Sequence, residues 1–178
     1  KFYLAGIPIK KLMNDYDLSF QDLKNYLPLD KKEIGKTKIK YSYLGYYIKW
    51  TPQEAFYYSV ENTNFKARPF RTEGTYSKYN SIDDKIDDLH YFTSYIKFGI
   101  GRASYDASQE IRNKHITRQE GVKLVSRFDG ETPNKYLNDV LDYLGIKKNH
   151  FFKLVDKFRS PHLWKKTKKG WVLRNTVF

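Results

Sequence analysis

The feature that most constrains this fold is an aromatic run that leads directly into a strongly capped helix. Residues 41–50 are almost continuously apolar or aromatic around Gly45, a composition typical of a strand covered on both faces. Thr51-Pro52-Gln53-Glu54 then supplies an N-cap hydroxyl, a proline at the first helical position and a glutamate three residues after the cap, which predicts a helix to about Asn62. One strand–helix unit cannot form a sheet. We therefore expect the rest of that sheet to lie outside this chain, which starts on Lys1, and the chain to be a fragment.

The residues after about 81 carry the periodicity and the start and stop signals of helices. Apolar side chains recur on one face from Ser81 until Gly99 and Gly101 interrupt the pattern, which predicts a broken helix pair. Three more helices are predicted: one from the Thr117–Glu120 capping box to Gly130, one from Thr132-Pro133 to Gly145, and one over about 149–159. The sequence thus predicts a mainly helical body.

The composition requires a folded chain and restricts its chemistry. Hydrophobic residues make up 40% and aromatic residues 17% of the 178 positions, too many for a chain that stays unfolded. There is no cysteine to act as a nucleophile or metal ligand, the four histidines are scattered, and no metal site is predicted. Apolar stretches fall well short of the roughly 20 residues of a membrane helix, and no secretion signal opens the chain. We expect a cytoplasmic location and no membrane partner.

The formal charge of +13 is unevenly distributed along the chain. Residues 51–100 carry 6 basic and 7 acidic side chains, so the excess lies towards the two ends. Lys165, Lys166, Lys168 and Lys169 form a basic tail, which we interpret as a solvated terminus rather than a nucleic-acid arm. Because the tyrosine-rich segments are predicted to be core, a nucleic-acid-binding module is disfavoured.

Three segments contain side chains suited to binding chemistry. Residues 66–80 show no period and many hydrogen-bonding groups, which predicts a long functional loop. The acids of Asp83–Asp88 weakly match an aspartate-rich magnesium motif, and their fit to the first turn of a helix capped by Ser81 is the favoured explanation. Lys97–Arg102 places two glycines between two cations at a helix start, which suits phosphate, although such glycines also occur where helices merely kink.

Taken in order, a set of longer motifs resembles the C-terminal half of N-acetyl sugar amidotransferases. These motifs are Tyr-Leu-Gly-Tyr-Tyr-Ile-Lys-Trp (43–50), Arg-Thr-Glu-Gly-Thr-Tyr (71–76), Ser-Ile-Asp-Asp-Lys (81–85), His-Tyr (90–91), Ile-Lys-Phe-Gly-Ile-Gly-Arg-Ala (96–103), Glu-Ile-Arg (110–112), Thr-Arg-Gln-Glu-Gly-Val (117–122), Phe-Asp-Gly (128–130) and Arg-Ser-Pro-His-Leu-Trp (159–164). The resemblance covers most of the chain. It implies a role in bacterial surface-polysaccharide pathways, including lipopolysaccharide biosynthesis, pseudaminic acid biosynthesis and flagellin glycosylation.

The resemblance also implies a reaction and a domain organisation. The family uses ATP to activate the oxygen of an acetamido group on a sugar, so that ammonia from a glutaminase partner gives an acetamidino group. Residues 1–65 would be the end of a Rossmann-like PP-loop ATP-binding domain, closing with its last strand–helix unit, and residues 66–178 a helical substrate or interaction domain. The family's Ser-Gly-Gly-x-Asp-Ser loop is absent, so ATP and Mg²⁺ are expected in the full-length enzyme and this chain alone is expected to be inactive.

The resemblance and the residue chemistry together predict a set of binding residues, with no catalytic residue assigned. The predicted phosphate contacts are Lys78, Lys85, Lys97 and Arg102. The predicted substrate contacts are Arg71, Glu73, Tyr76, Asp83 and Asp106, the last four toward sugar or magnesium. Two alternatives stay open: a non-catalytic helical interaction domain and a basic nucleic-acid-binding module.

Overall fold

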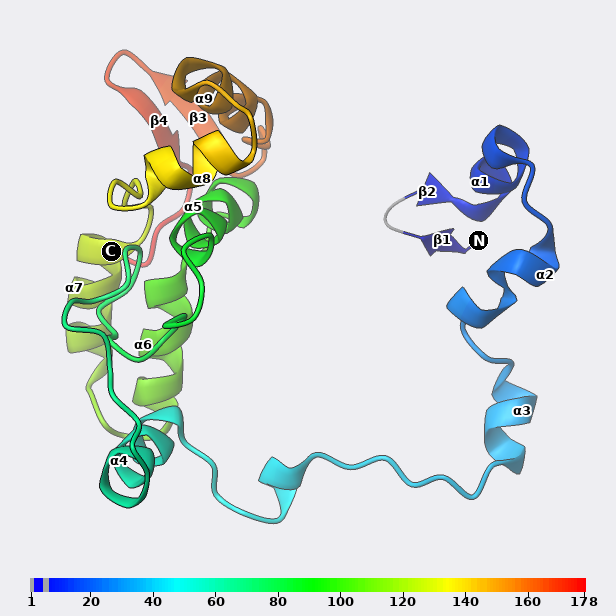
Figure 1. The fold of residues 1–178 in the computed structure, drawn as a ribbon, viewed down its shortest axis with the longest axis horizontal. Helices are drawn as coiled ribbons and strands as arrows, with labels where there is room; N and C mark the ends of the chain where they lie inside the picture. Colours follow the sequence, from blue (N-terminus) through cyan, green and yellow to red (C-terminus); the bar gives the residue numbers. More distant parts are fainter. Residues whose placement is uncertain (1, 5–6) are drawn as a thin grey trace. The chain divides into compact units, whose positions relative to one another are not determined.

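The structure is a computed structural model that describes residues 2–4 and 7–178, and the chain divides into two compact units, residues 1–48 and 49–178 (Figure 1). The first unit contains β1 (Tyr3–Leu4), β2 (Ile7–Pro8), α1 (Ile9–Tyr16), α2 (Phe20–Leu23), η1 (Lys24–Tyr26), α3 (Lys31–Lys36) and η2 (Leu44–Tyr46). β1 and β2 pair antiparallel. The buried apolar side chains among its described residues are Ile9 and Leu23, so this unit has only a small core.

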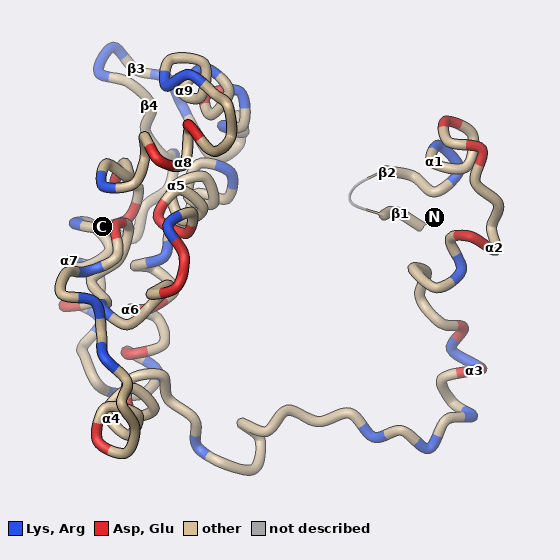
Figure 2. The backbone as a smooth tube through the Cα atoms, in the orientation of Figure 1, with Lys and Arg blue, Asp and Glu red and all other residues tan. Residues whose placement is uncertain are grey.

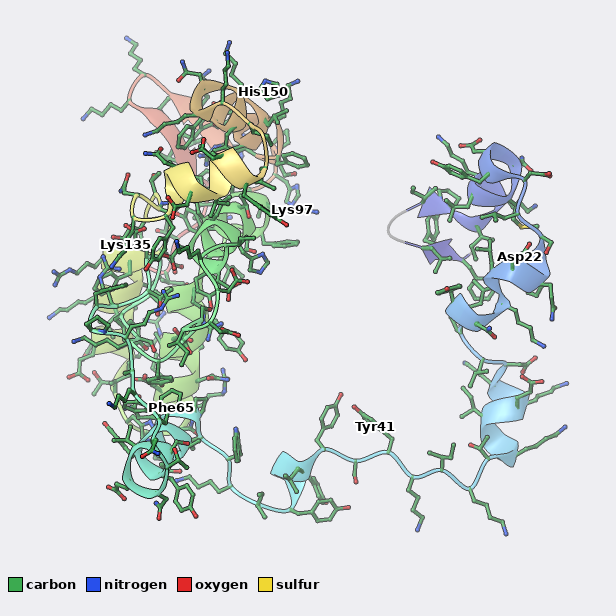
Figure 3. All side chains as sticks on the ribbon, viewed as in Figure 1. Asp22, Tyr41, Phe65, Lys97, Lys135 and His150 are labelled. Atoms are coloured by element: carbon green, nitrogen blue, oxygen red, sulfur yellow. The ribbon has the colours of Figure 1, made fainter. Side chains whose placement is uncertain are left out.

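The predicted strand at 41–50 is wrong. The segment holds one 3-10 turn, η2, in otherwise irregular backbone, and its rings are exposed rather than buried: Tyr41 is 80% and Tyr46 is 85% exposed. Figure 3 shows Tyr41 projecting from this backbone. A strand is held by hydrogen bonds to a neighbouring strand, and within the described residues strand pairing is confined to β1–β2 and β3–β4. The interpretation of this tyrosine-rich segment as core is wrong for the same reason.

The second unit consists, in its described residues, of helices and one hairpin. Its elements are α4 (Pro52–Asn62), α5 (Asp87–Phe98), α6 (Arg102–Arg112), α7 (Arg118–Phe128), α8 (Leu137–Tyr143), α9 (Lys148–Lys157), β3 (Trp164–Thr167) and β4 (Gly170–Leu173). This confirms the predicted mainly α C-terminal domain. None of the described helices combines the length and the apolar character that a bilayer span requires.

Most of the predicted helix boundaries in this unit are confirmed, because the signals are local. The Thr51 hydroxyl accepts a hydrogen bond from the Glu54 amide at the start of α4, and Thr117 forms the complete capping box of α7. The predicted break is also present: Gly99 ends α5 in the left-handed conformation at φ +72°, and α6 starts at Arg102.

Helix α5 starts later than the periodicity predicts, at Asp87 instead of near residue 81. The Asp84 carboxylate accepts a hydrogen bond from the Ile86 amide at 2.6 Å, and the Asp84 carbonyl accepts one from Arg68 at 3.0 Å. These contacts compete with the helical hydrogen bonds of the same groups. Ser81 therefore does not cap the helix, and residues 81–86 form turns.

Helix α8 also starts later than predicted, at Leu137 instead of at Thr132-Pro133. The amides of Asn134 and Lys135 donate to one carboxylate oxygen of Glu73, at 2.8 and 3.0 Å. A side chain some 60 positions away along the sequence thus fixes the entry to α8, and no local pattern carries that information.

The main core lies between α5, α8, α9 and the β3–β4 hairpin. Its buried members are Leu89, Phe92, Ile96, Leu137, Val140, Leu141, Phe151, Val155 and Trp164. Trp164 donates from Nε1 to the carbonyl of Ile96 at 2.7 Å, which ties the hairpin to α5. The basic segment at 165–169 is solvated, as predicted, but it is not a tail: its lysines are exposed on an ordered hairpin whose strand ends pack into this core.

Helices α6 and α7 form a second, closely packed layer. Ala103 and Ala107 of α6 are completely buried or nearly so. A Cβ at Gly121 of α7 would lie 2.6 Å from Cδ1 of Ile111, so the glycine permits the close approach of the two helices. Helix α6 of this pair forms one wall of the site described next.

Candidate functional site

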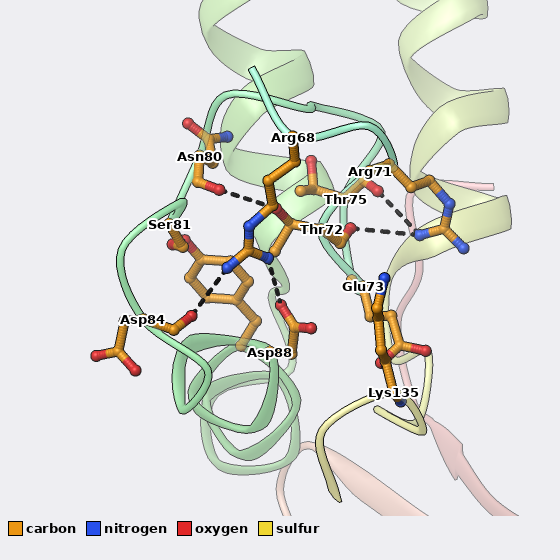
Figure 4. A network of polar contacts seen from close by, with 12 residues as sticks. Arg68, Arg71, Thr72, Glu73, Thr75, Asn80, Ser81, Asp84, Asp88 and Lys135 are labelled. Atoms are coloured by element: carbon orange, nitrogen blue, oxygen red, sulfur yellow. Dashed lines mark hydrogen bonds and ion pairs between the residues drawn. The ribbon is translucent and has the colours of Figure 1, made fainter. Parts of the chain in front are cut away.

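The loop between α4 and α5, residues 63–86, folds back on itself and covers α6 (Figure 4). The Thr72 amide donates to the carbonyl of Ser77 at 3.0 Å, and the Thr72 hydroxyl donates to the carbonyl of Asn80 at 2.9 Å. Gly74 turns the chain at φ +85°, which favours glycine. Thr72 and Thr75 have no exposed surface. The predicted functional loop is therefore an ordered element with a buried polar interior.

Arg71 fixes the tip of this loop to the segment after α7. Its guanidinium forms a two-pronged ion pair with Glu131, with Nη1 at 2.6 Å from Oε2, and also donates to the Thr75 carbonyl at 3.0 Å. Glu131 accepts a further hydrogen bond from the Gly74 amide at 2.8 Å. Burial raises the pKa of Glu131, but the hydrogen bonds from Arg71 and Gly74 outweigh it, so the pKa is lower than usual. In this structure Arg71 holds the loop in place.

A second ion pair lies in the wall formed by α6. Asp106 accepts hydrogen bonds from the Thr75 hydroxyl at 2.6 Å, the Asn80 amide nitrogen at 3.1 Å and Nε of Arg102 at 2.9 Å. Arg102 lies one helical turn before Asp106, and its guanidinium is flanked by the Tyr91 ring and by a second tyrosine ring of α6. Burial raises the pKa of Asp106 even though Thr75 and Arg102 oppose the shift.

A small polar cleft of about 140 Å³ opens between α6 and the loop. Its lining residues are Pro52, Gln53, Ser77, Tyr79, Asn80, Arg102, Tyr105, Asp106, Gln109, Glu110, Asn113 and His115. The Tyr79 hydroxyl donates to Gln53 at 3.0 Å, and the Tyr79 ring stacks on Phe56, which joins α4 to the cleft. Burial raises the pKa of Glu110. The cleft thus offers one cation, two acids and several amides and hydroxyls.

The N-terminus of α6 holds an anion from the protein itself. The Asp129 carboxylate accepts hydrogen bonds from the amides of Gly101 and Ser104, both at 3.1 Å, and from the Ser104 hydroxyl at 2.6 Å. A Cβ at Gly101 would lie 2.5 Å from Oδ1 of Asp129. The glycine predicted to admit a phosphate therefore admits a carboxylate.

The structure does not bring the four predicted phosphate contacts together. Arg102 lines the polar cleft, whereas Lys97 lines a separate, largely apolar groove beside α9 and lies at the surface of α5 (Figure 3). Lys78 is exposed with Nζ at 3.5 Å from the Pro69 carbonyl, and Lys85 pairs with Asp139 at 2.8 Å on the surface. Their role toward phosphate stays a prediction.

The predicted substrate contacts are also divided. Asp106 lines the cleft, and Arg71 and Glu73 hold the loop and the entry to α8. Tyr76 has a buried hydroxyl that makes no hydrogen bond to any described residue, and burial raises its pKa. Asp83 is exposed in the turns before α5. Of the nine predicted residues, Arg102 and Asp106 are the two that line one cavity.

Several residues of the site were not predicted. Glu110 lies within the Glu-Ile-Arg motif, and Asp129 lies within the Phe-Asp-Gly motif, with Glu131 directly after it. Their position in or beside these motifs was the only sequence feature that could have indicated a role. Their hydrogen-bond partners lie in distant segments of the chain. No group of three or more acidic or histidine side chains arranged for a metal ion occurs among the residues that the structure describes.

Arg68 and Asp88 form a buried ion pair on the other side of the loop (Figure 4). Nη1 of Arg68 lies 3.8 Å from Oδ1 of Asp88, and neither atom has a hydrogen-bond partner among the described residues. Burial raises the pKa of Asp88 to about 6; Arg68 and Lys135 lower it, while Glu73 and the neighbouring Asp87 raise it. The start of α5 therefore carries a carboxylate that is poorly compensated.

The cleft does not fit a nucleoside triphosphate with its magnesium ion. Three phosphates need several converging cations or free backbone amides, but the cation among the described lining residues, Arg102, is already paired with Asp106. The nearby helix N-terminus is filled by Asp129. An uncharged ligand with hydroxyl and amide groups matches the lining better.

The fold and the cleft define a helical domain with a small polar cleft. Residues 73–177 match the family described as "LPS biosynthesis protein WbpG-like, C-terminal domain". The match covers more than half of the chain, so the chain belongs to this family and has a role in lipopolysaccharide biosynthesis. This confirms the predicted resemblance to the C-terminal half of a polysaccharide-biosynthesis protein. No curated protein matches the chain.

Proposed function

We propose that this chain is the C-terminal part of an ATP-dependent amidotransferase that converts an acetamido group of a sugar into an acetamidino group. Ammonia would come from a glutaminase partner, and ATP with Mg²⁺ would bind in the full-length enzyme outside the polar cleft. A cytoplasmic location, the pseudaminic acid and flagellin pathways, and the assignment of residues 1–65 to an ATP-binding domain stay predictions.

The observation that carries the proposal is the balance of charge in the polar cleft. Asp106 and Glu110 face a single paired cation, Arg102, and burial raises the pKa of both acids. Amide and hydroxyl groups of Asn80 and Tyr79 complete the lining. Such a surface suits a hydroxylated, amide-bearing sugar, and it also suits the reaction product, because an amidine is protonated at neutral pH and would be attracted by Glu110, the acid of the cleft that Arg102 does not pair with.

The test compares the loss of a cation that lines the cleft with the loss of a cation elsewhere in the second unit. The full-length enzyme is incubated with ATP, glutaminase and candidate N-acetylated sugars, and the amidine product is detected by mass spectrometry. Arg102→Ala should lower kcat/KM by roughly 10- to 150-fold, the value of one charge-assisted contact of about 1.5–3 kcal/mol. Lys97→Ala is the matched control: if the cleft alone binds the substrate, its activity stays at the wild-type value, and if Lys97 also contacts phosphate, both variants lose activity.

Two results would contradict the proposal. Absence of any amidine product from the wild-type enzyme counts against the reaction, and full activity of Arg102→Ala counts against the cleft. A non-catalytic interaction domain within an active full-length enzyme predicts the second result. The exposure of the rings at 41–50 removes one of the two arguments against nucleic acid, while the distribution of charge toward the chain ends remains.

A further inference from the structure

The C-terminal lobe, residues 147–178, carries an unusual concentration of positive charge. It contains ten lysines and arginines and a single acid, Asp156. In Figure 2 the blue segments gather at the turn between β3 and β4 and along α9. Asp156 is already paired with Arg159 at 3.1 Å, so the lysines of this lobe have little local compensation. A surface of this kind attracts anions over a distance of about one Debye length.

The β3–β4 hairpin presents four of these lysines on a well-fixed element. Lys165 and Lys166 lie on β3, while Lys168 and Lys169 form the turn. The Thr167 hydroxyl closes that turn by donating to the Gly170 carbonyl at 2.9 Å. All four lysines are exposed, and within the described residues none of them forms an ion pair. The hairpin therefore holds a compact cluster of solvated charges.

We propose that this lysine hairpin is a docking surface for an anionic phospholipid bilayer. Eight of the ten basic residues of the lobe are lysines. Lysine is a flexible, strongly hydrated point charge, suited to a diffuse anionic surface, whereas specific two-pronged recognition of one phosphate or carboxylate favours arginine. The proposal concerns contact with the bilayer surface, and it departs from the expectation that a membrane is not among the partners.

The two other classes of anionic partner fit the hairpin less well. Single-stranded nucleic acid needs exposed rings beside the cations, but Trp164 is 4% exposed, and Trp171 is partly covered by Arg159 and Lys166. Protein interfaces are depleted in lysine at their centres and use aromatic and arginine anchors. The hairpin turn offers neither type of anchor.

The test uses the full chain and vesicles, and it does not depend on the amidotransferase activity. The probes are vesicles of pure phosphatidylcholine and vesicles of phosphatidylcholine and phosphatidylglycerol in equal parts, sedimented at low and high salt. The wild-type chain should bind the anionic vesicles only, and added salt should release it. Lys168→Gln/Lys169→Gln should bind about 25-fold more weakly, at roughly fivefold per lysine. Tryptophan fluorescence confirms that this exposed substitution leaves the fold intact.

The matched control removes the same charge from another pair of adjacent exposed lysines, Lys31→Gln/Lys32→Gln in α3. Binding close to the wild-type value in the control supports the assignment to the hairpin. An equal loss in both variants shows that binding follows net charge alone and overturns it. The proposal also fails if the wild-type chain ignores anionic vesicles at low salt. It fails too if a single-stranded RNA binds the hairpin more tightly than the vesicles do in the same buffer.

Discussion

Asp88 should make the second unit more stable at pH 5 than at pH 7. The pKa of its carboxyl is about 6 in the folded chain, against 3.8 for a free side chain. Because the folded state binds the proton more tightly, the ionised form destabilises the fold above pH 6, and the penalty is relieved as the pH falls through 6 toward 3.8. The full penalty is about 3 kcal/mol, of which about 1 kcal/mol is recovered between pH 7 and pH 5. Solvent screens little of it, since Asp88 is 3% exposed.

Urea unfolding followed by tryptophan fluorescence measures this effect, because Trp50, Trp164 and Trp171 all belong to the second unit. Asp88→Asn keeps the size of the side chain and removes its titration. Between pH 7 and pH 5 the wild-type chain should gain about 1 kcal/mol relative to this variant. At each pH the free energy of unfolding of Asp88→Asn is subtracted from that of the wild type. This subtraction removes the contribution of every group that titrates independently of Asp88, including the buried Asp106.

The control is Asp83→Asn, which removes an exposed acid just before the same helix and should leave the pH dependence of the wild type unchanged. Parallel curves for the wild type and Asp88→Asn, within about 0.3 kcal/mol, would refute the reasoning. They would mean that Asp88 is hydrated, or that Arg68 approaches it closely enough to hold the carboxylate in its ionised form.

Three further changes test the contacts that shape the site. Gly101→Ala should lower stability by about 1–3 kcal/mol in urea unfolding, since the new methyl group displaces the Asp129 carboxylate from three hydrogen bonds; an unchanged midpoint would show that Asp129 moves without loss. Glu131→Gln should cost about 1–3 kcal/mol, because the partly buried Arg71 loses its ionised partner, and limited proteolysis should then cut the loop tip faster than in the wild type. Trp164→Phe should cost about 1–3 kcal/mol, because a buried carbonyl of α5 loses its donor, and hydrogen exchange should show faster opening of the hairpin; equal exchange rates would count against that anchor.

Helix boundaries could be predicted where the determining groups lie within one turn of each other. The Thr117 capping box and the Gly99 left-handed cap are of this kind, and the structure has both. The predicted starts of α5 and α8 are wrong because contacts outside the periodic pattern decide them. Before α5 the Asp84 carboxylate binds the Ile86 amide and Arg68 binds the Asp84 carbonyl, and before α8 Glu73 binds two amides. Periodicity carries no information about such contacts.

The site could be predicted only where one helix face carries it. Arg102 and Asp106 are four residues apart on α6, so helical spacing alone places them together. Lys78 and Lys85 lie in the loop between α4 and α5, whereas Lys97 lies near the end of α5. Their positive charge alone did not indicate whether the three lysines lie close together. The predicted strand at 41–50 is wrong for a related reason. The composition of the segment suits burial, but burial requires another element that packs against it, and the local sequence does not show whether such an element is present.

The short segment after α7 connects the two walls of the polar cleft without lining it. Asp129 holds the N-terminus of α6, which carries Arg102, and Glu131 holds the loop tip through the Gly74 amide and Arg71. Between these two acids, Gly130 adopts φ +77°, a conformation that other residues rarely adopt. Two acids separated by one residue therefore set the two walls: Asp129 fixes the position of α6, and Glu131 fixes the position of the loop. Because these acids are close in sequence, a backbone shift at residue 130 would disturb the contacts of both walls, so the shape of the cleft depends on a segment that does not line it.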